Sequence, residues 1–141
     1  MVSEGIGDLR DVFSVSIDWK PLEAGIERRL KLFQTAVAQT DPQRAGDELG
    51  VYCDLVSDVI RAKVIVAITD HNYAELSNLA DEVNMMLAPV RGPSHTKKVG
   101  LIRLRNYVRK LGEHLVDGLS LDCANNKIER EEPYLKSVII R

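Results

Sequence analysis

Arg109 and His114 are the two residues whose types and spacing are best suited to chemistry in this sequence. They are separated by four residues within the stretch RLRNYVRKLGEH, which runs from Arg103 to His114. An unperturbed histidine titrates near neutral pH, so it can accept and donate a proton. An arginine can stabilise negative charge that develops in a transition state. The pair therefore predicts, as one alternative, acid–base chemistry on a substrate that gains negative charge.

The spacing Arg-x4-His resembles the Arg-x(4–6)-His signature of HEPN domains, which are all-helical, of about this length and often dimeric. In many members the arginine and histidine of two subunits meet in a dimer cleft and cleave RNA without a metal ion. The resemblance therefore implies an endoribonuclease with Arg109 and His114 as its catalytic pair. Lys110 follows the arginine directly, at a position where many active members carry a small polar residue.

A basic segment surrounds this pair, since residues 83–112 hold seven Lys or Arg residues and no Asp or Glu. The seven are Arg91, Lys97, Lys98, Arg103, Arg105, Arg109 and Lys110. Such asymmetry is typical of a nucleic-acid contact, of a site for an acidic protein partner, or of the solvated face of a helix. On a helical wheel the charges flank the apolar positions on both sides, and Tyr107 is the one aromatic residue nearby. We therefore expect a solvated face, with nucleic-acid binding as an alternative.

No cofactor and no metal site is expected from the sequence. The three histidines are scattered, and Cys53 and Cys123 form no C-x2-C spacing. The glycine patterns that hold nucleotide phosphates are also missing. Two isolated cysteines, no signal peptide and no apolar run of about 20 residues favour a cytoplasmic protein without a membrane partner.

The spacing of apolar residues predicts four principal helices that would position these side chains. The first begins near Leu22, the second follows Asp41 as its N-cap, and the third follows Asn72 as its N-cap. The fourth begins near residues 94–96 and carries the strongest apolar stripe. This near-heptad seam consists of Leu101, Leu104, Val108, Leu111, Leu115 and Leu119. Such a seam is typical of helix–helix packing.

Residues 62–70, AKVIVAITD, fit either the end of the second helix or a buried strand, because the period of a short apolar run does not distinguish a helix from a strand. With the residues that follow, this run resembles the final strand and helix of sugar isomerase domains. The serine-rich phosphate-binding turn of that family is absent. The predicted fold class is therefore mainly α, a four-helix bundle-like domain, with α+β as the alternative if 62–70 is a strand.

Short extended segments are expected at both ends of a single domain that covers residues 1–141. In the N-terminal arm, residues 1–20, four apolar residues alternate with polar ones, which is the pattern of a strand. These four are Phe13, Val15, Ile17 and Trp19. A helical core is expected over residues 22–118. A polar connector and a short extended segment are expected over residues 119–141.

These features favour a non-enzymatic helical module for protein–protein interaction, with an assembly, adaptor or regulatory role. The seam and the arm both offer apolar surfaces for packing, so we expect self-association or binding to another protein. The predicted interaction residues are Phe13, Val15, Ile17, Trp19, Leu104, Val108 and Leu111. A HEPN-like ribonuclease and a basic-helix nucleic-acid-binding protein are the alternatives.

Overall fold

The computed structural model describes residues 17–141, and every regular element within that range is a helix. The elements are α2 (Lys20–Ala38), α3 (Pro42–Thr69), α4 (Glu75–Leu87), η1 (Ala88–Val90), α5 (Thr96–Val116), α6 (Leu121–Glu131) and η2 (Pro133–Val138), of which η1 and η2 are 3-10 helices. The mainly α fold class predicted from the apolar spacing is therefore confirmed.

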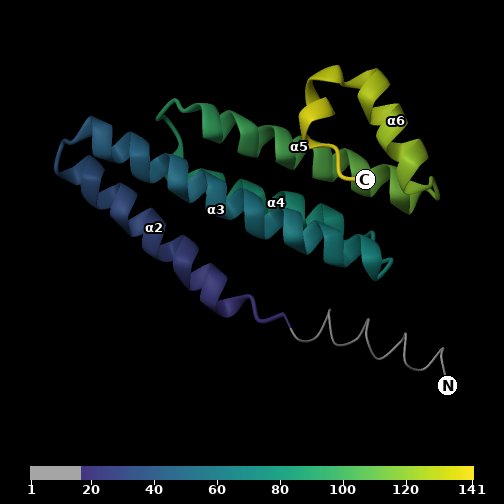
Figure 1. The fold of residues 1–141 in the computed structure, drawn as a ribbon, viewed down its shortest axis with the longest axis horizontal. Coiled ribbons are helices and arrows are strands. Elements are labelled where there is room, and N and C mark those ends of the chain that lie inside the picture. Colours follow the sequence, from purple (N-terminus) through teal and green to yellow (C-terminus); the bar gives the residue numbers. More distant parts are fainter. Residues whose placement is uncertain (1–16) are drawn as a thin grey trace.

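Helix α3 is the centre of the arrangement, because α2, α4 and α5 all pack against it (Figure 1). α2 forms a hairpin with α3, and α4 and α5 pack closely on one another. α6 and η2 fold onto α5 and onto each other. No helix within residues 17–141 is long and apolar enough to cross a membrane.

The predicted seam on α5 lies in the core of the molecule. Five of its six members are buried, and Leu119 is half-buried just beyond the end of the helix. Leu104, Val108 and Leu111 are each fully buried. Packing of this stripe against neighbouring helices removes apolar surface from water, which is the main force that stabilises such a fold.

Residues 62–70 continue α3, so the α+β alternative is wrong. Helix α3 runs without interruption from Pro42 to Thr69, and its buried residues recur with the helical period through Ile60, Val64 and Ala67. In a strand Val64 and Ala67 would point to opposite faces, yet both are buried, with 0% and 4% exposure, as expected for positions three apart on one face of a helix. Residues 62–70 therefore do not form the strand that the resemblance to sugar isomerase domains implied.

Helix starts depend on local caps, one of which was predicted correctly. The Asp41 side chain accepts a hydrogen bond of 3.1 Å from the Arg44 N–H at the start of α3. The Asn72 N-cap is wrong: α4 begins at Glu75, and Asn72 contributes only its backbone carbonyl, which accepts from the Glu75 N–H at 3.2 Å. Residues 71–74 complete the turn after α3 before the next helix can begin.

Helix ends show where the backbone is strained. Thr40, His71 and Gly118 each follow a helix end in a left-handed conformation, with φ of 52°, 57° and 98° respectively. Glycine adopts this conformation without steric cost, whereas residues with a Cβ do so rarely. Thr40 and His71 therefore hold strain that the surrounding structure must offset.

The C-terminal part differs from the predicted connector and extended segment. Residues 121–131 form α6 and residues 133–138 form a 3-10 helix, so most of the predicted connector and extended segment is helical. A buried hydrogen-bond network holds this part in place. The Tyr107 hydroxyl donates to Asn125 Oδ1 at 2.9 Å and accepts from the Ile140 N–H at 2.9 Å. Asn125 Nδ2 donates to the Ile140 carbonyl at 2.6 Å.

Candidate functional site

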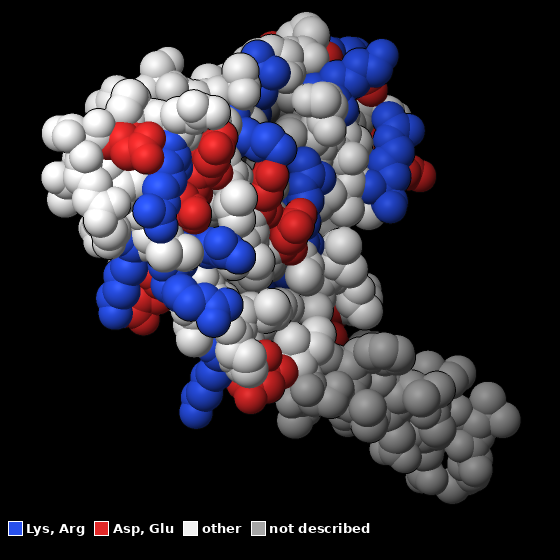
Figure 2. Space-filling view, turned by 60° about the vertical axis from the view of Figure 1, so that its left-hand side comes forward, with Lys and Arg blue, Asp and Glu red and all other residues white. Residues whose placement is uncertain are grey.

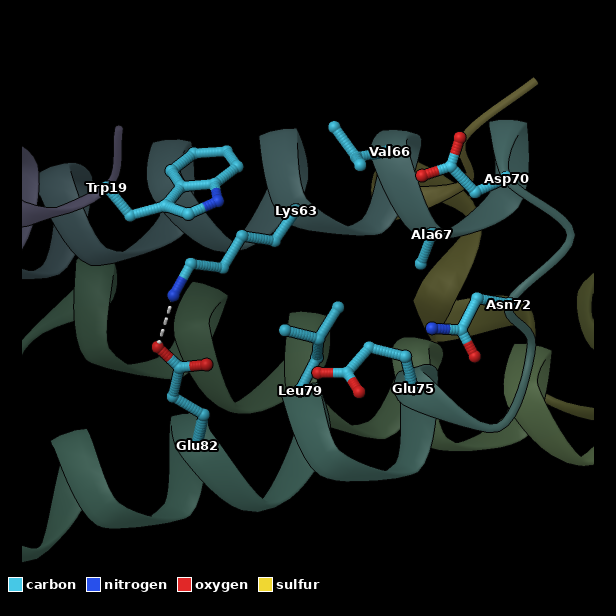
Figure 3. Close-up of a pocket in the computed structure, with 9 residues that line it drawn as sticks. All are labelled: Trp19, Lys63, Val66, Ala67, Asp70, Asn72, Glu75, Leu79 and Glu82. Carbon is cyan, nitrogen blue, oxygen red and sulfur yellow. Dashed lines mark hydrogen bonds and ion pairs between the residues drawn. The ribbon is translucent and has the colours of Figure 1, made fainter. Parts of the chain in front are cut away.

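A cavity of about 230 Å³ opens between α3 and α4, with Trp19 at its edge (Figure 3). We name it the Trp19 cavity. It is lined by Trp19, Lys63, Val66, Ala67, Asp70, Asn72, Glu75, Leu79 and Glu82. Two helices, the turn between them and the residue that precedes α2 therefore supply its walls, so the site exists only in the folded chain.

Lys63 forms one end of the cavity. Its Nζ lies 2.8 Å from Glu82 Oε1 and 3.3 Å from Glu23 Oε1, and 5.4 Å from the centre of the Trp19 ring. Burial by itself lowers the pKa of Lys63, but the hydrogen bonds and charges of Glu82 and Glu23 outweigh it, so the pKa is raised. Lys63 is therefore a fixed cation, and a neutral amine for nucleophilic catalysis is not formed at ordinary pH.

The other end of the cavity carries oxygen atoms from the turn between α3 and α4. Asp70, Asn72 and Glu75 line it, and Figure 3 shows them apart from Lys63. Asp70 has no ion-pair partner in residues 17–141, and Glu75 Oε2 accepts a hydrogen bond of 3.1 Å from Asn78 Nδ2. The strained residue His71 stands between two of these lining residues. Such strain often occurs where a backbone positions functional groups.

The lining of the Trp19 cavity is suited to a positively charged group. Its charged residues are one lysine and three carboxylates, and the lysine is already neutralised by Glu82 and by Glu23 outside the lining. The Trp19 ring at the edge lies at the Lys63 end of the cavity, with Lys63 Nζ 5.4 Å from its centre. The volume is smaller than the roughly 300–1,000 Å³ of sites for drug-sized ligands, so it fits a single side chain better. No group of three His, Cys, Asp or Glu residues that could hold a metal ion occurs in residues 17–141.

Arg109 and His114 do not face a common cleft of one chain. Arg109 lines a groove of about 530 Å³ between α4 and α5, and its Nη2 lies 3.4 Å from Asp81 Oδ1. His114 is buried, and its Nε2 has no hydrogen-bond partner among the described residues. His114 lies five positions after Arg109 on α5, so the two side chains are about 140° apart around the helix axis. The Arg-x4-His spacing therefore does not assemble a catalytic pair within the monomer.

Four of the seven members of the basic segment have polar partners within residues 17–141, and two of these four are ion-paired with carboxylates. Lys97 and Arg109 form ion pairs with carboxylates of α3 and α4, Arg105 binds two asparagine side chains, and Lys98 binds two backbone carbonyls. The members without such a partner in residues 17–141 are Arg91, Arg103 and Lys110. On the face drawn in Figure 2, basic and acidic side chains lie next to one another, with no continuous basic surface.

The predicted interaction residues have different positions in the structure. Phe13 and Val15 lie outside the described residues, and Ile17 is half-buried in the segment before α2. Trp19 packs on the core and forms the edge of the cavity. The seam residues Leu104, Val108 and Leu111 are fully buried within this chain, so they pack its core and offer no surface to a partner.

Sequence reasoning missed Lys63, Asp70, Glu75 and Glu82. The one available signal was the position of Lys63 within the apolar run AKVIVAITD, where a charge on the buried side of a helix requires a partner. The identity of that partner was not visible, because Glu82 is 19 residues away and Glu23 is 40 residues away.

Comparison of the chain with protein-family models, with curated proteins and with solved structures finds no match. The function is therefore argued from the geometry of the site.

Proposed function

We propose that this chain is a helical protein-interaction module that binds a basic side chain of a partner protein in the Trp19 cavity. The observation that carries the proposal is the combination of a small volume, about 230 Å³, with a lining in which carboxylates outnumber cations. A partner's arginine or lysine would place its charge at Asp70 and Glu75, the end of the cavity that Lys63 leaves free.

The interaction strength expected from this geometry is modest. Each hydrogen bond between the partner's cation and a carboxylate of Asp70 or Glu75 contributes roughly 1.5–3 kcal/mol. One side chain alone therefore binds with a Kd of about 1 mM, and a partner surface around it must supply the remaining affinity. Such a module suits an assembly, adaptor or regulatory role. Two unpaired cysteines, Cys53 and Cys123, suit the reducing cytoplasm, where we place this role.

Trp19 provides a direct measurement, because it is the only tryptophan of the chain. We expect acetyl-Gly-Arg-Gly-amide to change the Trp19 fluorescence with a saturating, millimolar titration. The neutral peptide acetyl-Gly-Gln-Gly-amide has a similar size and should leave the emission unchanged. An equal response to both peptides contradicts recognition of the positive charge.

The variant Asp70→Asn/Glu75→Gln keeps the shape of the cavity and removes its free carboxylates. We expect it to weaken binding of the arginine peptide at least tenfold, because two charge-assisted hydrogen bonds are lost. Asp58→Asn is the matched control, since Asp58 is exposed on α3 and does not line the cavity. Unchanged binding by the double variant, with its helical circular dichroism retained, contradicts the proposal.

A further inference from the structure

A second cavity, of about 340 Å³, lies where α3, the first turn of α5 and η2 meet. It is lined by Cys53, Asp54, Ser57, Arg61, Thr96, Lys97, Gly100, Leu101, Ser137 and Val138. We name it the Arg61 cavity. Its volume is within the roughly 300–1,000 Å³ of sites that hold small molecules, in contrast to the Trp19 cavity.

Arg61 is the cation of this cavity that other side chains do not neutralise. It is half-buried, and its Nε donates to Ser57 Oγ at 3.4 Å. No carboxylate in residues 17–141 pairs with its guanidinium. Lys97, the other cation, is paired with Asp54 at 2.7 Å, so the lining keeps one net positive charge. The guanidinium of Arg61 is therefore available to an anion that enters the cavity.

Three residues with hydroxyl groups line the same cavity as Arg61, and each belongs to a different element. Ser57 belongs to α3, Thr96 to α5 and Ser137 to η2. The first turn of α5 contains no acidic residue that would repel an anion. A planar guanidinium donates two parallel hydrogen bonds to a phosphate, and hydroxyls supply further donors around it.

From these contacts we propose that the Arg61 cavity binds the phosphate group of a small phosphorylated ligand. Arg61 holds two phosphate oxygens, the hydroxyls of Ser57, Thr96 and Ser137 surround the remaining ones, and the rest of the ligand extends along the cavity. This site is independent of the Trp19 cavity and does not rest on the function proposed for it.

The role of this cavity is binding and not covalent catalysis. Cys53 is the one thiol in its lining, and burial, together with the charge of Asp54, raises the pKa of this thiol to about 11. A thiol with such a pKa stays protonated at neutral pH and is a poor nucleophile.

Thermal unfolding of the full chain tests the proposal with inorganic phosphate and with glycerol phosphate as probes. Sodium chloride at equal ionic strength is the reference. A ligand at roughly 100 times its Kd stabilises the folded state enough to raise the Tm by several degrees. We expect both phosphate compounds to raise the Tm above the chloride reference. Glycerol phosphate should act at lower concentration than inorganic phosphate if the cavity also contacts the organic part.

Substitutions show whether the phosphate-dependent rise in Tm arises from the Arg61 cavity. Arg61→Gln should abolish the phosphate-dependent shift, and Ser137→Ala should reduce the affinity several-fold while leaving the fold unchanged. Arg103→Gln is the control, because Arg103 is an exposed arginine of α5 outside the cavity, and it should keep the full shift. A Tm in phosphate equal to the Tm in sodium chloride at the same ionic strength contradicts the proposal. So does a shift that survives Arg61→Gln or that Arg103→Gln also removes.

Discussion

Single residues of this protein take their roles from their neighbours rather than from their types. Arg109 and Arg61 are both arginines on helices, yet Arg109 is neutralised by Asp81, whereas Arg61 has no carboxylate partner in residues 17–141. Lys63 is a fixed cation because Glu82 and Glu23 hold it. The same logic applies to the two cysteines, whose environments differ in burial.

Thiol modification distinguishes the two cysteines. Cys123 is exposed, whereas Cys53 is buried with a pKa raised to about 11. At pH 8 the Cys53 thiol is therefore almost entirely protonated, and only 1% of the residue is exposed. We therefore expect a disulfide reagent such as Ellman's reagent to modify one thiol quickly in the native protein and the second only after unfolding.

The pH dependence follows from the same pKa. Any Cys53 reaction in the native state should accelerate as the pH rises toward 11, since the thiolate is the reactive form. Cys123→Ser isolates the buried thiol for this measurement. Rapid reaction of both thiols at pH 8, with native circular dichroism, contradicts the assignment.

At the scale of elements, helix ends depend on local sequence, whereas helix contacts depend on residues far apart. Helices α4 and α5 pack closely at Gly112, where an added Cβ would lie 2.9 Å from the Cβ of Leu76. Real Cβ atoms essentially never approach so closely, and the atom they would meet belongs to a fully buried leucine. Gly112 therefore allows the two helices to pack at their observed distance.

Gly112→Ala should destabilise the protein. Overpacking in a tight core costs roughly 1–3 kcal/mol, which exceeds the gain of about 1 kcal/mol in helix propensity. Gly100→Ala is the matched control on the same helix, because nothing lies within 4 Å of its added Cβ. We expect this control to be more stable than the wild type by about 0.5–1 kcal/mol in urea unfolding. Equal stability of the two variants contradicts the close contact.

At the scale of the whole molecule, packing around α3 buries the apolar seam of α5. The seam suggested self-association in the sequence, but in the structure it is not available to a partner. The surface left for a partner contains exposed apolar residues, such as Ile65 and Met85, and also exposed cations without ion-pair partners in residues 17–141. Among these cations are Arg28, Arg44 and Arg103. We therefore propose self-association in which a neighbouring copy of the chain supplies the basic side chain that binds in the Trp19 cavity.

Light scattering coupled to size-exclusion chromatography tests this proposal. We expect a mass above the 15.8 kDa of one chain at tens of micromolar protein. The Asp70→Asn/Glu75→Gln variant should shift the mass toward the monomer, because its cavity has lost the carboxylates that bind the partner. A monomer mass for the wild type over 10 to 100 µM contradicts self-association and leaves a different protein as the partner.

The sequence by itself determined the helical class, the Asp41 cap and the buried stripe on α5, because these depend on residues within a few turns of one another. It did not reveal α6, whose buried residues are only Ala124, Asn125 and Ile128 and whose position depends on Tyr107. Only the tertiary structure decided which residues line the Trp19 cavity and the Arg61 cavity. Lys63 meets Glu82 and Glu23 across 19 and 40 residues, and no local spacing encodes such contacts. Packing of α2 and α4 against α3 creates them.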